Sequence, residues 1–170
     1  DVLVQSRLAE CSCRVVENGK IKEVPILPEL SHLVGLPQEK AFHEFDGWYH
    51  TLAVVSETEP DLTLRWGALL HDVAKGMPTI RQVINGRYTD RGHDNLGAEV
   101  AYDLLIRLGY NKKFASRVSW IVKNHMRFHF FVQNEEADEK KWMRKEIRSG
   151  EFRDSQSMRE AWLQLAKVAC

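Results

Sequence analysis

Four histidines and one aspartate are set into apolar segments of this sequence, and any fold must accommodate them. His50, His71, Asp72, His93 and His125 each lie beside or within an apolar run rather than in a polar loop. Burying such polar groups without a partner costs roughly 1–3 kcal/mol each. Because a single metal ion can satisfy all of them together, and facing helices commonly build such sites, we predict a metal site at their meeting point.

The spacing of apolar residues from Pro28 onward predicts an all-α fold, with Asp46, Asp61 and Asn111 as N-caps of three helices. We expect an irregular helical bundle of six to eight helices. The predicted helices cover a short segment beginning at residue 28, and then residues 47–58, 62–73, 93–108, 112–127, 139–149 and 155–168.

Strand signals are weak. Residues 13–27 hold Asn18-Gly19 between two short β-branched runs, which predicts a hairpin, although a frayed helix end followed by a loop is an equal alternative. Residues 79–91, with a turn at Asn85-Gly86, and residues 132–139 are predicted to be loops. The length predicts a single domain over residues 1–170, with residues 1–24 as an N-terminal extension.

The charge composition argues against a free-standing nucleic-acid binder. Lys plus Arg and Asp plus Glu both number 24, so the formal net charge is zero, whereas such binders usually carry a basic excess. A local basic strip is one interpretation of Lys112, Lys113, Arg117, Lys123 and Arg127, but a solvated helix face is the commoner reason for such a pattern. No apolar stretch reaches the ~18 residues that would suggest a membrane span.

The cysteines indicate a reducing compartment. Cys11, Cys13 and Cys170 are too few, and odd in number, for a disulfide framework, so we expect reduced thiols and a cytoplasmic protein. The chain begins without Met and stops just after an amphipathic segment, which indicates a piece of a longer protein.

The kinds of ligand narrow the choice of metal. Imidazoles with a carboxylate suit Mn, Fe, Co, Ni or Zn, whereas Mg prefers oxygen ligands. No cysteine joins the set, so a structural zinc site is not expected. Arg87 and Arg91 lie near the predicted site in sequence, where one could steer a phosphate inward, with ordinary loop charge as the alternative.

A set of motifs resembles the HD superfamily of metal-dependent phosphohydrolases. They are Leu69-Leu70-His71-Asp72-Val73-Ala74-Lys75-Gly76, the preceding His50-Thr51-Leu52, the following Gly92-His93-Asp94, and His125. Further motifs look like the HD domain attached to bacterial CCA-adding tRNA nucleotidyltransferases: Leu27-Pro28-Glu29-Leu30, Val34-Gly35-Leu36-Pro37-Gln38, His43 and Trp48-Tyr49-His50. The resemblance covers roughly residues 25–130, and it is specific because HDxxKG occurs together with its flanking histidines.

The resemblance implies a divalent-metal phosphohydrolase that acts on a nucleotide, a cyclic nucleotide or a phosphorylated RNA end. Asp72 would bind metal with one oxygen and orient water with the other, and Lys75 would face the phosphate. The implied metal ligands are His50, His71 and Asp72, with His93 and His125 binding a second metal or contacting substrate oxygens. The implied catalytic residues are Asp72, Lys75, His93 and His125, with Lys75 and Arg91 contacting substrate.

One departure from the family pattern supports an alternative function. The family site usually ends with an aspartate in a pattern like Leu-Ala-Lys-Ala-Asp, but this chain reads Leu165-Ala166-Lys167-Val168-Ala169-Cys170. Either that ligand is lost or it lies past residue 170. The alternative is therefore a catalytically weak HD-fold module that binds nucleotide or RNA, as a fragment of a tRNA nucleotidyltransferase-like protein. We do not assign CCA addition, because the nucleotidyltransferase half is not recognised in the chain.

The remaining histidines and the tryptophans have simpler interpretations. His32 is expected at the surface, and His43 and His129 at the surface or next to the ligands. His125 could instead be a histidine favoured by the dipole at a helix end. The five tryptophans, Trp48, Trp66, Trp120, Trp142 and Trp162, are interpreted as core or helix-packing residues.

Overall fold

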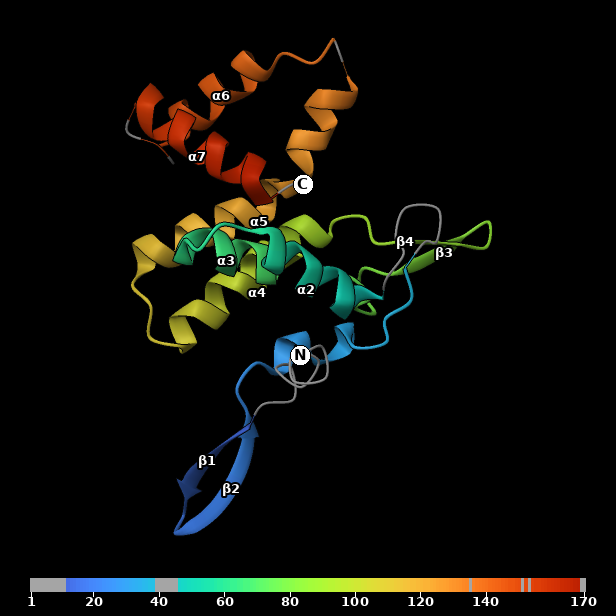
Figure 1. Cartoon of the computed structure of the whole chain (residues 1–170), viewed down its shortest axis with the longest axis vertical. Helices are drawn as coiled ribbons and strands as arrows, with labels where there is room; N and C mark the ends of the chain where they lie inside the picture. The colour runs from blue at the N-terminus through green and yellow to red at the C-terminus, as the bar shows by residue number, and fades with distance from the viewer. Residues whose placement is uncertain (1–11, 39–45, 135, 151, 153, 169–170) are drawn as a thin grey trace.

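A computed structural model describes residues 12–38, 46–134, 136–150, 152 and 154–168 (Figure 1). The predicted all-α bundle is confirmed. Within the described residues, the helices are the 3-10 helix η2 (Pro28–Leu33) and the α-helices α2 (Gly47–Glu57), α3 (Leu62–Leu70), α4 (His93–Arg107), α5 (Lys112–Gln133), α6 (Glu139–Arg148) and α7 (Ser155–Val168). Two antiparallel hairpins accompany them: β1 (Ser12–Glu17) with β2 (Lys20–Pro25), and β3 (Gln82–Ile84) with β4 (Arg87–Thr89).

The three predicted N-caps start the helices that they were expected to start. The side chain of Asp46 accepts a hydrogen bond from Tyr49 N at 2.8 Å. Asp61 and Asn111 accept from the third residue after them in the same way, at 2.9 Å each. Each cap satisfies one of the backbone N–H groups that the first turn of a helix leaves without an intrahelical partner.

Two predicted helix ends are wrong, and one predicted loop is partly strand. The helix expected over residues 62–73 ends at Leu70 and passes into turns up to Gly76, whose φ of +78° is left-handed. The helix expected over 112–127 continues to Gln133, because no Gly or Pro interrupts it, and part of the loop expected at 132–139 is therefore helical. The loop expected at 79–91 contains the β3–β4 hairpin.

Both hairpins turn at an Asn-Gly pair. Asn18 and Asn85 have φ of +52°, and the glycine after each also has positive φ, as a type I′ turn requires. At the N-terminus the hairpin interpretation is therefore the one the structure shows. The β1–β2 hairpin projects from the helical body, on the side opposite α6 and α7 (Figure 1).

Two apolar clusters share helices α3 and α5. The first cluster joins η2 and α2 to α3, α4 and α5 through Leu30, Leu33, Trp48, Leu70, Val73, Leu104, Leu105, Val118 and Val122. The second joins α3 and α5 to α7 through Leu64, Ala68, Trp120, Ile121, Met158, Ala161 and Leu165. Packing on both sides holds α3 and α5 rigidly, and these helices lead to His71 and carry His125.

Tryptophans occupy the positions expected of packing residues. Trp48 and Trp120 are buried, and Trp66, Trp142 and Trp162 are partly buried against the two clusters. No helix in the ranges given above is both long and apolar enough to cross a lipid bilayer.

The contact between α3 and α5 yields a stability prediction. A Cβ added at Gly67 would meet Ile121 Cγ2 at 2.8 Å, closer than packed carbon atoms lie. We expect Gly67→Ala to lower the free energy of unfolding by about 1–3 kcal/mol, because overpacking outweighs the gain in helix propensity. Urea unfolding of the metal-free protein measures this change.

The control removes Ile121 Cγ2, the atom with which the new methyl group of Gly67→Ala would clash. In an Ile121→Ala background, Gly67→Ala should cost clearly less than in the wild type, since neighbouring substitutions couple. Equal costs in the two backgrounds would show that the close approach of α3 and α5 is not what requires glycine.

Candidate metal centre

The structure brings together the five polar residues that the sequence places in apolar segments. His50 comes from α2, His71 and Asp72 follow the end of α3, His93 begins α4, and His125 lies on α5. All but His50 are less than a tenth exposed, and the side chain of His50 is 23% exposed. The site is therefore buried, and His50 is its most exposed member.

The carboxylate of Asp72 divides its two oxygens between two histidine pairs. Oδ2 lies 3.2 Å from His71 Nε2 and 3.5 Å from His50 Nε2. Oδ1 lies 3.3 Å from His93 Nε2 and 3.7 Å from His125 Nε2. Within each pair the two Nε2 atoms are 3.2 Å apart. Each oxygen thus forms a compact triangle with two imidazole nitrogens.

These spacings suit ligands of a cation. Bonds of about 2.1 Å from a metal to nitrogen and oxygen place neighbouring ligand atoms about 3.0 Å apart in octahedral and about 3.4 Å apart in tetrahedral geometry. The six distances above range from 3.2 to 3.7 Å. The residues can therefore hold a metal with little movement, as one group of His50, His71 and Asp72 and a second of Asp72, His93 and His125.

Backbone carbonyls fix the orientation of three imidazole rings. Nδ1 of His71 donates to Ala68 O at 2.7 Å, and Nδ1 of His125 donates to Val122 O at 2.6 Å. Nδ1 of His93 donates to Asp90 O at 2.8 Å. Because a carbonyl oxygen can only accept, each Nδ1 carries the proton, and in the neutral ring Nε2 presents a lone pair to the centre.

The His93–His125 pair consequently lacks a proton to share. Two neutral rings whose Nε2 lone pairs face each other at 3.2 Å repel, unless a proton or a cation lies between them. Ligated histidines usually show this arrangement, with Nδ1 bonded outward and Nε2 directed at the metal. The ring orientation favours a metal ligand set over a structural hydrogen-bonded cluster.

The carboxylate is charged and poorly satisfied by protein groups. Burial raises the pKa of Asp72, but its electrostatic interactions with His71 and with Lys75 outweigh burial and hold this pKa well below its ordinary value. Lys75 Nζ lies 2.8 Å from Oδ2 and 3.4 Å from Gln38 Oε1. Beyond the ion pair with Lys75, neither Asp72 oxygen accepts a hydrogen bond of good geometry from the described residues, so both oxygens could still bind a cation.

His125 is neutral in this environment. Burial, followed by the electrostatic interaction with His71, lowers the pKa of His125 to about 3. A histidine must be neutral to bind metal, so this shift prepares His125 as a ligand. The alternative of a partly exposed histidine at a helix end is wrong, since His125 is 5% exposed and α5 continues for eight more residues.

The centre lies in a cavity of about 820 Å³. Lys75 and Arg91 line it as expected, and the lining includes residues that sequence reasoning did not single out for the site: Gln38, Val54, Arg81, Tyr88, Asp90, Met126, Phe130 and Val168. His129 also lines the cavity. His43 lies outside the described residues.

His32 is not a free surface residue. Its Nε2 is 3.0 Å from the carbonyl oxygen of Lys75, a contact across 43 residues of sequence. The expectation of a surface role is therefore wrong, because His32 is partly buried and supports the backbone beside Asp72. No local pattern could have shown this contact.

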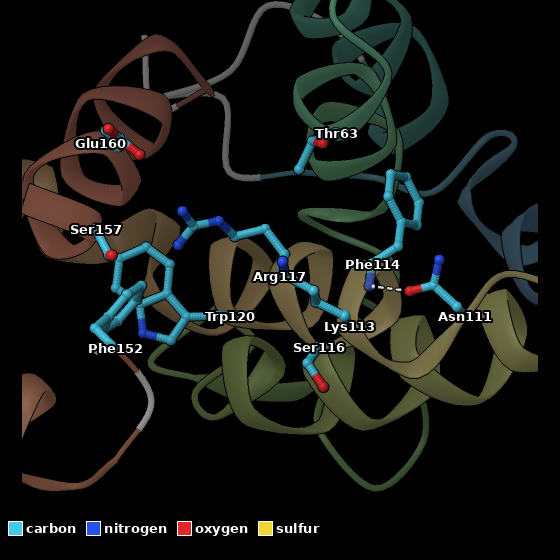
Figure 2. A pocket seen from close by; sticks show the side chains of 10 residues that line it. All are labelled: Thr63, Asn111, Lys113, Phe114, Ser116, Arg117, Trp120, Phe152, Ser157 and Glu160. Atoms are coloured by element: carbon cyan, nitrogen blue, oxygen red, sulfur yellow. Dashed lines mark hydrogen bonds between the residues drawn. The ribbon is translucent and has the colours of Figure 1, made fainter. Parts of the chain in front are cut away.

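A second hollow, of about 610 Å³, lies over the N-terminal half of α5 (Figure 2). Lys113 and Arg117 line it, and the guanidinium of Arg117 lies 5.2 Å from the centre of the Phe152 ring. Its lining has one carboxylate, on Glu160, and no histidine or cysteine. It therefore offers no metal-ligand set comparable to the first cavity.

A protein-family comparison identifies the domain that carries this cluster. The family model described as HD domain matches residues 47–149, the segment that contains all five clustered residues. The chain belongs to the HD domain family. In this HD domain, the residues that could hold a metal ion are His50, His71, Asp72, His93 and His125.

Several curated relatives are similar to this HD domain. It is 37% identical over 105 residues to the A-adding tRNA nucleotidyltransferase of Deinococcus radiodurans, covering 59% of this chain and 24% of that protein. It is 38% identical over 105 residues to the CC-adding tRNA nucleotidyltransferase of Thermus thermophilus, with the same shares of 59% and 24%. The Multifunctional CCA protein of Cupriavidus necator is 30% identical over 108 residues, or 61% of this chain and 25% of that protein. The match thus spans about a quarter of each relative.

The lowered pKa of His125 predicts how acid affects stability. Its native pKa of about 3 is below the unfolded value of 6.5, so the unfolded state binds more protons between these two pH values. We expect the free energy of unfolding of metal-free protein to fall by about 1.4 kcal/mol per pH unit from this residue as pH drops from 6.5 toward 4. The Asp72 contribution is lost only at lower pH, because its native pKa is below 3.8.

Urea unfolding at several pH values, compared with His125→Gln, measures this contribution. In His125→Gln the free energy of unfolding should fall less steeply with decreasing pH. The difference between the two slopes should be about 1.4 kcal/mol per pH unit. Identical slopes for the two proteins would mean that His125 is already protonated in the native state.

Proposed function

We propose that this HD domain is a metal-dependent phosphohydrolase that cleaves a phosphate ester of a nucleotide, a cyclic nucleotide or an RNA end. The observation that carries the proposal is the division of the Asp72 carboxylate between two pairs of inward-facing imidazoles. A bound divalent cation supplies a Lewis acid and lowers the pKa of water, which is what ester hydrolysis at neutral pH needs.

The proposed ligands form two groups that share Asp72. His50 and His71 would hold a cation with Oδ2, and His93 and His125 would hold a cation with Oδ1. Two imidazoles and one carboxylate leave coordination positions open for water and substrate, as catalytic sites require. The ligand types favour Mn, Fe, Co, Ni or Zn over Mg.

Among the cations that line the cavity, Lys75 and Arg91 have the best access to a phosphate. Lys75 Nζ already reaches the centre, 2.8 Å from Asp72, and can stabilise negative charge that develops on a phosphoryl group. Arg91 is exposed at the cavity wall, where it can attract an anion. Arg81 is less suited, because it forms two hydrogen bonds with Asp90.

The cavity supports a substrate larger than phosphate alone. Its volume of about 820 Å³ lies in the range of small-molecule sites. Val54, Met126 and Phe130 add apolar surface beside the charged centre, and Tyr88 adds an aromatic ring. A phosphorylated molecule with an apolar or aromatic body fits this division, and the tRNA-named relatives favour an RNA end or a nucleotide.

One observation favours a second candidate, a binding module with weak turnover. The last described residue of α7, Val168, lines the cavity where the family pattern would bring a late aspartate nearby. Either Ala169 or a residue past 170 falls at the corresponding position, and Ala169 lies outside the described residues. Metal that binds with no turnover of any nucleotide ester would favour this module over the enzyme.

Replacing Asp72 gives the decisive test. We expect Asp72→Ala to abolish metal retention and phosphohydrolase turnover together, because both ligand groups lose their only carboxylate. Metal analysis after purification, together with a phosphatase and phosphodiesterase screen under Mn, Co and Ni, measures both effects.

A matched control uses a neighbouring carboxylate in the same cavity. Asp94 lines the cavity but belongs to neither ligand group, so Asp94→Ala should retain metal. Unchanged turnover in Asp72→Ala would reject the proposed mechanism, even if the protein still bound metal.

A further inference from the structure

The three inward-facing histidines with fixed Nδ1 protons are not held in equivalent ways. His71 and His125 donate to Ala68 O and Val122 O, which are carbonyls inside the regular helices α3 and α5. His93 is the first residue of α4, and it donates to Asp90 O, which lies before the helix begins. Helical packing therefore fixes two of these acceptors but cannot fix the third.

The start of α4 adds little support of its own. Its N-cap is Gly92, with φ of +88° and no side chain that could cap the helix. Both His93 N and His93 Nδ1 donate to Asp90 O, at 3.1 and 2.8 Å. The position of one main-chain oxygen thus sets the backbone, the ring orientation and the tautomer of His93.

The side chain of Asp90 anchors that oxygen. Oδ1 accepts from Gly76 N at 2.9 Å and from Arg81 Nε at 3.0 Å, and Oδ2 accepts from the Arg81 guanidinium at 2.7 Å. The other terminal nitrogen of Arg81 donates to Pro37 O at 2.6 Å. Both side chains are largely buried, 9% exposed for Asp90 and 14% for Arg81. The forked pair, fixed at both ends, ties the segment before His93 to the turn that follows Asp72.

We propose that Asp90 is a positioning residue for His93, held in place by Arg81 and Gly76, and that the His93–His125 half of the centre depends on it while the His50–His71 half does not. The inference rests on the proposed function for its consequence in catalysis. Its structural content, the control of one histidine ring, can be measured without any metal or substrate.

The first experiment reads the imidazole nitrogens of metal-free protein by ¹⁵N NMR, in the wild type and in Asp90→Ala. The wild type should show Nδ1-protonated rings at His71, His93 and His125. In Asp90→Ala only His93 should lose this state and move toward an exchange average of its tautomers. An unchanged His93 ring in folded Asp90→Ala would overturn the proposal.

The control variant removes a comparable ion pair elsewhere. Nη2 of Arg107 donates to both carboxylate oxygens of Glu29, at 2.7 and 2.9 Å, in a more exposed position. Glu29→Gln should leave all three rings unchanged. An equal disturbance of His71, His93 and His125 in Asp90→Ala would indicate general loosening of the fold and would also overturn the proposal.

The second experiment measures binding of Mn²⁺ alone. Loss of a group that orients a ligand typically weakens metal binding by roughly 10–100-fold. We expect Asp90→Ala to show this loss in the wild-type and His50→Gln backgrounds, and no further loss in His93→Gln. A full further loss in His93→Gln would show that Asp90 does not act through His93.

A milder variant guards against loss of folding. Asp90→Asn keeps an oxygen for Gly76 N but places an amide against Arg81. It should therefore change the tautomer populations of the His93 ring in the same direction as Asp90→Ala, by a smaller amount. No shift in a folded Asp90→Asn would count against the proposal if Asp90→Ala does not fold. If no phosphate ester is turned over, the proposed function fails, but the NMR result still decides the role of Asp90.

Discussion

The arrangement of the helices around this centre follows from one buried carboxylate. Asp72 is 1% exposed and lies against four imidazoles and an ammonium group, three of the imidazoles coming from distant helices and His71 and Lys75 from its own segment. An ionised carboxylate at this depth needs several partners, because burial alone opposes its charge. The helices α2, α3, α4 and α5 must therefore converge with their histidines at this point, and the two apolar clusters hold them there.

Packing and chemistry are consequently linked through α3 and α5. These helices belong to both apolar clusters, lie close enough at Gly67 to exclude a methyl group, and place His71 and His125 on opposite oxygens of Asp72. Movement of one helix relative to the other would separate the two ligand groups. The stability of the core and the geometry of the centre depend on the same contacts.

Much of the fold could be predicted because its signals are local. The caps at Asp46, Asp61 and Asn111 and the apolar periodicity are properties of short segments, and the clustered histidines follow from their apolar surroundings together with a family resemblance. The predicted end of α5 is too early, because residues 126–133 continue the helix with no Gly or Pro to stop it. The contacts of His32 with Lys75 and of Asp90 with Gly76 cross loops of irregular shape, and only the folded backbone brings them together. Which histidine pair each Asp72 oxygen faces depends on how the imidazole rings are oriented. The residue types alone do not specify those orientations.

The main-chain acceptors of His71 and His125 have a consequence for how such a domain can evolve. Every residue type offers the same carbonyl, so selection on the ligands places little constraint on which side chains occupy positions 68 and 122, beyond the need to pack. Drift at these positions can leave the centre intact. At position 90 the carbonyl depends on a particular carboxylate and its arginine, so the two residues are expected to be inherited or lost together across descendants of this chain.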